Sequence, residues 1–159
     1  MKNEGYDIEL RLIEKKSNDD VLNEISNADL IVDQLIIGWY AMFAIESMAL
    51  EKPVICYLRD DLLDFYSQKG ILSRENLPLI NATPQNIFHK LKKAYESPDM
   101  LQKTSEKGPD FVRSMHSIES VGKVFLNINE SIGLYPRRVW YSYFLVNDRK
   151  LTKIKKEQE

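Results

Sequence analysis

The chain has 159 residues, the length of one domain, and 43% of them are apolar, which is enough for a hydrophobic core. Its 22 Lys and Arg nearly balance 24 Asp and Glu, so no basic field indicates a nucleic-acid-binding protein. The lone cysteine, Cys56, excludes a disulfide framework and a multi-cysteine zinc site. The acidic N-terminal residues lack the apolar run of a secretion signal, and we expect a cytoplasmic protein.

The first half of the chain alternates the patterns of strands and helices. Apolar and charged side chains alternate over residues 8–13, which predicts a strand with one covered face, and Asn18 is expected to cap the next helix. Residues 53–58 are nearly all apolar, as in a parallel strand covered on both faces. In chain order we expect strand 8–13, helix 18–27, strand 30–32, helix 41–50 and strand 53–58. This alternation predicts an α/β fold with a parallel sheet.

The second half is expected to be mainly helical. A less regular stretch, 59–76, precedes a short expected strand at 77–80, and Thr83 followed by Pro84 predicts the start of a helix. Another helix is expected over about 99–113, broken near Gly108 and Pro109. The last expected helix begins at a Ser117 cap and ends at Gly133, and its stripe consists of Ile118, Val121, Phe125 and Ile128.

Residues 137–159 differ in composition from the rest. They hold seven basic and three acidic residues, a net of +4 that leaves −6 on residues 1–136, and we place a domain boundary between these two parts. Aromatic and basic side chains together suit a weak, peripheral contact with a membrane surface or a partner. The alternative is an additional element packed on the domain, followed by a solvated tail.

Glu46 is the residue at which the local patterns conflict. Its helical neighbours, Met42, Phe43, Ala49 and Leu50, are apolar, which places the carboxylate on an apolar stripe. Burying an unpaired charge is costly, so either a basic residue pairs with Glu46 or a ligand supplies the donors. Arg59 or a residue of the C-terminal helices could be the basic partner of Glu46. A ribose with two adjacent hydroxyls could be the ligand, because a carboxylate accepts two hydrogen bonds at once.

The residues before Glu46 favour a phosphorylated ligand. Asp33 and Gln34 follow an expected strand, and ligands of parallel α/β sheets bind at the carboxyl ends of strands. The helix that follows offers free amides at its N-terminus, and Gly38 and Ala41 are small enough to let a phosphate approach.

Residues 33–57, DQLIIGWYAMFAIESMALEKPVICY, resemble the donor-binding motif of retaining GT-B glycosyltransferases, above all bacterial enzymes of surface-polysaccharide synthesis in glycosyltransferase family 1. The resemblance covers about residues 6–129. It implies a Rossmann-like parallel sheet with flanking helices, the C-terminal half of a GT-B fold. In that family one Glu faces the sugar and a second, eight positions later, accepts from the ribose. Glu46 matches the second Glu, and Gly38 stands where the first would be.

The resemblance implies a nucleotide-sugar donor as substrate, with no metal and no other cofactor. It places the donor against substrate-binding residues Gln34, Gly38, Tyr40, Ala41, Met42 and Glu46, with residues 14–18 near the base. Two departures from the family pattern bear on donor affinity, since Ala41 and Glu51 stand where the family commonly has Gly.

The resemblance also implies that parts of the enzyme are not in this chain. The acceptor-binding domain, the first strands of the donor domain and the basic residues that hold the diphosphate have no counterpart here. We identify no catalytic residue, because His89, His116 and Asp33 lack the placed partners of a general base. The chain alone is expected to be inactive, as a truncated donor domain that needs the acceptor domain. The alternative is a non-catalytic module that docks to a partner chain through an uncovered sheet edge.

Overall fold

The computed structural model describes residues 5–134. They belong to two compact units, Met1–Ser114 and Met115–Glu159, which we describe separately. The expected basic extension, 137–159, lies outside the described residues, and so does the membrane contact predicted for it.

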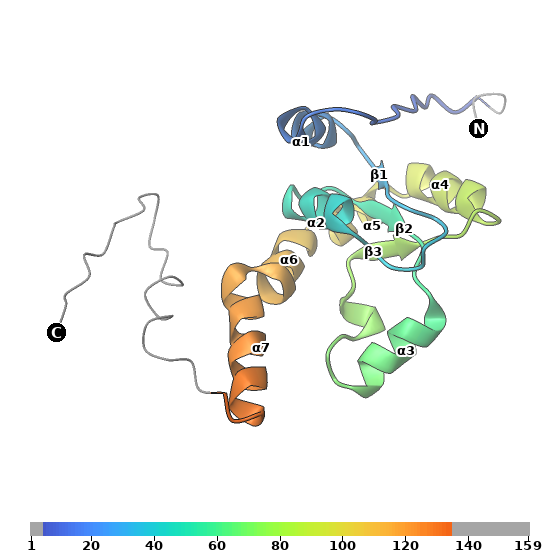
Figure 1. The fold of residues 1–159 in the computed structure, drawn as a ribbon. Coiled ribbons are helices and arrows are strands. Elements are labelled where there is room, and N and C mark those ends of the chain that lie inside the picture. Colours follow the sequence, from blue (N-terminus) through green and yellow to red (C-terminus); the bar gives the residue numbers. More distant parts are fainter. Residues whose placement is uncertain (1–4, 135–159) are drawn as a thin grey trace. The chain divides into compact units, whose positions relative to one another are not determined.

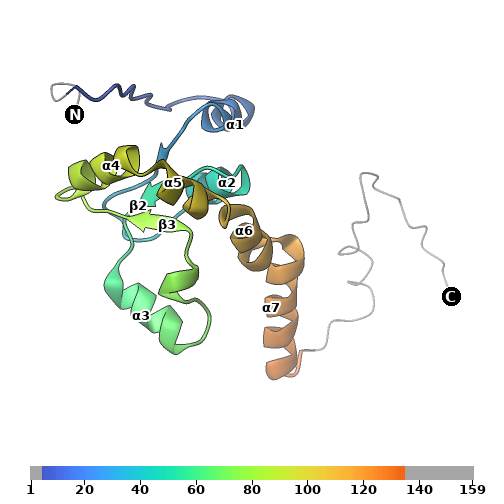
Figure 2. The same cartoon turned by 180° about the vertical axis from the view of Figure 1, so that it is seen from behind.

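The first unit is built on a three-stranded parallel sheet, seen from opposite sides in Figures 1 and 2. Its strands are β1 (Ile31–Val32), β2 (Val54–Cys56) and β3 (Leu79–Asn81), in that spatial order. Ile31 pairs with Val54, and Val54 pairs in turn with Leu79. All three residues of β2 are buried, as expected for a strand covered on both faces. The prediction of an α/β fold with a parallel sheet is confirmed.

Helices surround this sheet and continue into the second unit. Their bounds are α1 (Asn18–Ser26), α2 (Met42–Ala49), α3 (Asp60–Gln68), α4 (Ile87–Glu96), α5 (Pro98–Ser105), α6 (Gly108–His116) and α7 (Ile118–Ser131), with a 3₁₀ turn, η2, at Arg74–Asn76. Helix α2 lies against β2, and α1 lies against α2. Fully buried side chains from these three elements form the core, including those of Ile25, Met48 and Ile55.

The predicted capping residues agree with the structure at some helix ends and not at others. The Ser117 hydroxyl accepts from the Ser120 amide at the start of α7, and Gly133, with φ +74°, ends that helix. The cap of α1 is Ser17 and not Asn18, because the Ser17 hydroxyl accepts from the Asp20 amide. The break between α5 and α6 is confirmed, and α6 begins at Gly108.

Two expectations for residues 59–96 need correction. The stretch thought irregular contains α3, which begins with Asp60 and Asp61 at the positive end of the helix dipole. Thr83 and Pro84 do not begin α4. Pro84 lies in a turn, and Thr83 precedes that turn. The Asn86 side chain accepts a hydrogen bond from the Thr83 amide, and the helix starts at Ile87.

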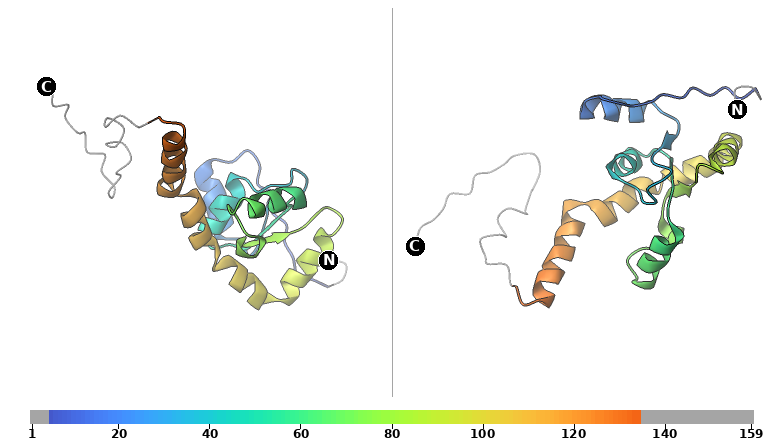
Figure 3. Two further views of the ribbon diagram at one scale, coloured as in Figure 1. Left: turned by 90° about the horizontal axis from the view of Figure 1, so that it is seen from below. Right: turned by 45° about the vertical axis from the view of Figure 1, so that its right-hand side comes forward.

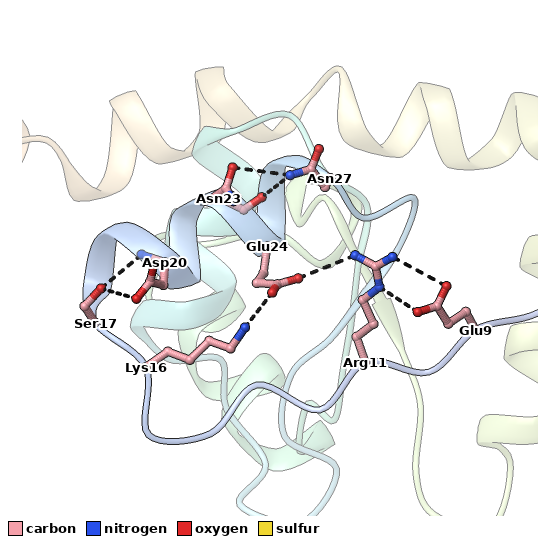
Figure 4. A network of polar contacts seen from close by, with 8 residues as sticks. All are labelled: Glu9, Arg11, Lys16, Ser17, Asp20, Asn23, Glu24 and Asn27. Carbon is pink, nitrogen blue, oxygen red and sulfur yellow. Dashed lines mark hydrogen bonds and ion pairs between the residues drawn. The ribbon is translucent and has the colours of Figure 1, made fainter.

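The strand predicted at residues 8–13 is wrong. These residues adopt no regular secondary structure, and the side chains of Leu10 and Leu12 are 85% and 76% exposed. Alternation is a local pattern, whereas a strand also needs a neighbour to pair with. Side chains hold the segment instead. The carboxylate of Glu24 on α1 accepts from Lys16 and contacts Arg11, as Figure 4 shows.

Candidate functional site

Polar residues gather where the three parallel strands end. Asp33 and Gln34 follow β1, Arg59 lies shortly after β2, and Asn81 is the last residue of β3. The carboxyl ends of parallel strands lie at one edge of a sheet, which is where α/β proteins bind ligands. The Asn81 amide joins two of these strand ends, because it accepts from the Leu58 N–H at 2.9 Å and donates to the Leu58 carbonyl at 3.1 Å. Two hydrogen bonds therefore link the end of β3 to the chain that follows β2.

Gln34 organises the loop that leads from β1 to α2. Its Oε1 accepts from the amides of Ile36, Ile37 and Gly38 at 2.9, 2.6 and 3.3 Å. Its Nε2 donates to the carbonyls of Trp39 and Tyr57 at 2.7 and 2.9 Å and contacts Cys56 Sγ at 3.2 Å. The polar atoms of Gln34 are thus occupied by the protein itself. Gln34 acts on the site as a positioning residue, by fixing the backbone of residues 36–39.

Gly38 is buried within this loop, and its conformation requires glycine. Its φ is +92°, and a Cβ there would overlap the aliphatic part of the Arg59 side chain. The Gly38 carbonyl accepts from the Arg59 amide at 2.9 Å, which ties the loop to the end of β2. The backbone at Gly38 approaches protein, although the sequence interpretation assigned this closeness to a phosphate.

Aromatic packing holds the end of the same loop. The rings of Trp39 and Tyr40 stack with centroids 5.3 Å apart, Trp39 also contacts Tyr66 at 4.9 Å, and Tyr40 meets the edge of Phe111 at 6.1 Å. Burial raises the pKa of Tyr40 to about 12, with a smaller contribution from Tyr66, so its hydroxyl stays protonated at neutral pH. Tyr40 can donate a hydrogen bond but cannot serve as a base there.

The N-terminus of α2 has no side-chain cap. Its cap residue is Ala41, whose own amide donates to Asp33 Oδ2 over 3.4 Å. The amides of the first helical turn, which begins at Met42, receive no side-chain acceptor from the described residues. Ala41 is exposed, and 64% of Met42 is exposed. Free amides and the helix dipole give this end the properties of an anion site.

Glu46 lies one turn further along α2, on its outward face. The buried residues of this helix are Ala44, Ser47 and Met48, whereas Glu46 is partly exposed and shares its face with Met42. Glu46 is therefore half-buried, neither fully removed from solvent nor on a fully solvated face. The pattern placed apolar neighbours around Glu46 correctly, but those on its own face, Met42 and Leu50, are themselves exposed.

The carboxylate of Glu46 makes no hydrogen bond or ion pair with any part of the chain that the structure describes, although the Glu46 carbonyl accepts from the Leu50 amide within the helix. Arg59, the partner named for a structural ion pair, instead binds Asp61, with 2.9 Å between Nε and Oδ1. The carboxylate therefore remains available to hydroxyl donors from outside the chain.

The other candidate groups carry little chemistry. The pKa of the buried Cys56 thiol is raised to about 12, first by burial and then by the charge of Asp33, so the thiol is no nucleophile at neutral pH. Burial lowers the pKa of His116, and His89 is exposed beside Phe88. The loop at 14–18 is engaged with α1 through Lys16 and Ser17. Among residues 5–134, no cluster of His, Cys, Asp or Glu could hold a metal ion.

A separate surface depression lies where α4 meets α5. It is lined by Glu96, Ser97, Pro98, Asp99, Met100, Lys103, Thr104 and Lys107. This depression is open and has charges of both signs, and it contains none of the residues that the sequence pointed to. Sequence reasoning missed Asn81 and the positioning role of Gln34. The only signal for either was a side-chain amide at the end of an apolar strand.

Comparison of the chain with protein families, curated proteins and solved structures gives no match. None of the helices within residues 5–134 is long and apolar enough to cross a membrane.

Proposed function

We propose that this chain is the nucleotide-sugar-binding part of a glycosyltransferase with the GT-B fold, acting in the cytoplasm in polysaccharide or glycoconjugate synthesis. One observation carries the proposal. The first turn of α2 has no side-chain cap, and one turn later the same helix presents a Glu46 carboxylate that has no partner within residues 5–134. The similarity of residues 33–57 to the family's donor-binding motif supports the same assignment.

These two features suit the diphosphate and the ribose of a nucleotide sugar. In an α-helix, Met42 and Glu46 are separated by about 6 Å along the axis and lie on the same face. Amides at the helix start would bind the negatively charged diphosphate, and the carboxylate would accept from the two ribose hydroxyls. Gln34 and Gly38 would keep the preceding loop in place, and Tyr40 would add a protonated hydroxyl.

Calorimetric titration of the whole chain with UDP and with GDP tests this assignment. We expect binding by the wild type, and a Kd higher in Glu46→Gln by the equivalent of about 1.5–3 kcal/mol, because a charged acceptor is lost. Glu130→Gln on α7 removes the same charge elsewhere and should leave binding unchanged. Absence of binding at millimolar nucleotide, or equal loss in both variants, would contradict the proposal.

We also propose that the chain alone does not transfer sugar. Glycosyl transfer needs groups that stabilise the leaving diphosphate and that position an acceptor. Among the described residues the α2 amides would bind the diphosphate, but we identify no basic side chain placed to neutralise it as it leaves and no group that positions an acceptor. A donor-hydrolysis and transfer assay with the purified chain should show no turnover, and adding a separately expressed acceptor domain from a relative should increase it. Turnover by the chain alone that is abolished in Glu46→Gln would show that the catalytic groups are here.

One observation favours a second candidate, a non-catalytic module that docks to a partner chain. In the described sheet β1 has a neighbour on one side only. The amides of Ile31 and Asp33 bond to the β2 chain, so the peptide groups of Val32 between them face the open edge. An open edge can accept a strand from another polypeptide. Light scattering separates the candidates, since an associated state without nucleotide affinity favours docking and a nucleotide-binding monomer opposes it.

A further inference from the structure

Helix α6 contacts two parts of the proposed nucleotide site. The contacts are made by Gly108 and Phe111, which are three positions apart and therefore lie on the same face of the helix. Both residues are buried, and both belong to the first unit, as do α2 and the loop before it. Figure 3 shows from two further directions that the start of α6, in yellow-orange, lies beside α2, in cyan. The buried face of α6 is therefore turned toward the helix that carries Glu46.

Gly108 allows the backbone of α6 to approach the last turn of α2 closely. A Cβ at position 108 would lie 2.6 Å from the carbonyl oxygen of Met48 and 3.2 Å from its Cα. Because these are backbone atoms in a close-packed interior, a larger residue would displace one of the two helices. Hydrogen bonds couple the turns of a short helix, so a displacement at Met48 also moves Glu46 and the amides at Met42.

Phe111 restricts the ring of Tyr40. Phe111 is 7% exposed, and the two rings meet edge to face at 69° with centroids 6.1 Å apart. Trp39 stacks on Tyr40 at 5.3 Å and 27°. A stacked contact and an edge contact on one ring together restrict rotation about its side-chain torsions. Phe111 therefore helps to fix the direction in which the half-buried Tyr40 presents its hydroxyl.

The direction of this hydroxyl decides whether it can bind a phosphate at the start of α2. The hydroxyl stays protonated at neutral pH and can donate a hydrogen bond to a phosphate oxygen. Tyr40 immediately precedes Ala41, the cap residue of α2, so it lies at the same helix end as the uncapped amides. A hydrogen bond weakens steeply when its donor is misaligned. A change at Phe111 should therefore change the affinity for the nucleotide.

We propose that Gly108 and Phe111 on α6 are positioning residues of the nucleotide site, Gly108 acting through α2 and Phe111 acting through Tyr40. Neither residue touches the nucleotide. This inference rests on the proposed function, and it adds α6 to the elements on which the affinity of the site depends. A purely structural role would lower stability alone, whereas a positioning role also lowers the affinity of the folded protein.

Calorimetric titration of the full chain with UDP and with GDP tests the role of Phe111. Phe111→Leu keeps an apolar side chain but removes the ring that meets Tyr40. It should raise the Kd about 3- to 10-fold, because the hydrogen bond from Tyr40 is weakened. Phe88→Leu makes the same change at a 38% exposed ring on α4 and should leave the Kd unchanged. Equal Kd values for wild type and Phe111→Leu would overturn the role of Phe111.

A double-mutant cycle separates positioning from loss of stability. Tyr40→Phe removes the hydroxyl, keeps the ring and should raise the Kd at least as much as Phe111→Leu does. In the Tyr40→Phe background, Phe111→Leu should have no further effect on the Kd, because no hydroxyl remains to be positioned. Its effect on the midpoint of urea unfolding should be the same in both backgrounds. Independent effects of the two substitutions on the Kd would contradict a role through Tyr40.

Gly108→Ala tests the contact with α2. It should raise the Kd about tenfold or more, because it displaces both the amides and Glu46. Gly122→Ala on α7, where a Cβ would meet nothing within 4 Å, is the matched control and should leave the Kd unchanged. Circular dichroism establishes that each variant is folded, and the cycle at Phe111 tests α6 independently of Gly108→Ala.

The same titrations distinguish failure of this inference from failure of the proposed function. Wild-type binding with unchanged Kd values in folded Gly108→Ala and Phe111→Leu would overturn the inference and leave the proposed function intact. Absence of wild-type binding at millimolar nucleotide would overturn both.

Discussion

Two loops of the first unit are held in different ways. The loop at 34–41 is held by its own residues. The Gln34 side chain hydrogen-bonds to the backbone of Ile37 and Trp39, and Gly38 packs against Arg59. The segment at 9–16 is held from outside, by ion pairs of Arg11 and Lys16 with Glu24 on the surface of α1 (Figure 4). Removing one partner of a partly buried hydrogen bond lowers the stability of the fold, whereas an exposed ion pair contributes little to that stability. We therefore expect a rigid strand-end loop and a replaceable N-terminal segment.

Gln34→Leu should have the largest effect on stability. It removes the side-chain bonds to Ile37, Trp39 and Tyr57 while keeping a similar volume, and leaves partly buried peptide groups without partners. We expect a loss of about 2–4 kcal/mol in the free energy of unfolding, measured by urea denaturation. Gln85→Leu, at an exposed turn, is the matched control and should change it little. Equal effects at the two positions would remove the distinction between the loops.

Gly38→Ala should follow, with a loss of about 1–3 kcal/mol. Its cause is twofold, a φ of +92° and the overlap of the new Cβ with the Arg59 side chain. Gly70→Ala separates these causes, because Gly70 also has a positive φ but its Cβ would meet nothing within 4 Å. A Gly70→Ala variant as unstable as Gly38→Ala would mean that the contact with Arg59 is unimportant.

Lys15→Gly should act in the opposite direction. Lys15 has a φ of +52° in the N-terminal segment, which is unfavourable for a residue with a Cβ. Glycine relieves that conformation but gains freedom in the unfolded chain, so we expect stabilisation of at most about 1 kcal/mol. Glu51→Gly at the end of α2, where φ is +56°, should behave alike in thermal unfolding. Destabilisation in both would show that the left-handed conformation is favourable there.

Glu24→Gln should have the smallest effect. Lys16, then Arg11, lowers the pKa of the Glu24 carboxyl, so its stabilising charge is present above the ordinary pKa of Glu and is lost as pH falls through the lowered value. Wild type should exceed the variant slightly in melting temperature at pH 7 and equal it at pH 2. High salt should also abolish the difference. A difference that persists in both conditions would assign Glu24 a role beyond these ion pairs.

The contrast between the loops also shows what the sequence could predict. The apolar run of β2, the Ser117 cap and Gly133 at the end of α7 are local signals, and the structure agrees with them. Pairing of residues 8–13 depends on a neighbouring strand, which no local pattern contains. The bonds from Gln34 to Tyr57 and from Asn81 to Leu58 each span 23 positions in the sequence, so neither could be predicted.

The candidate site was predictable to a similar extent. The sequence located Glu46 and the start of its helix, because apolar spacing and small residues are visible there. It did not predict that the outward face of α2 is exposed, since exposure depends on which side of the helix meets β2. Nor did it predict that Arg59 would bind Asp61 rather than Glu46.

The most direct test of the central claim is an amide NMR titration of the full chain with UDP and with GDP. The account predicts that the largest shifts occur at the amides of Met42, Phe43 and Ala44 in the first turn of α2, with smaller ones at Gly38. In Glu46→Gln the same amides should respond only at higher nucleotide concentrations. Shifts confined to the α4 and α5 depression around Lys103, or no shifts at 10 mM nucleotide, would contradict the claim that the strand-end loop and α2 form a nucleotide site.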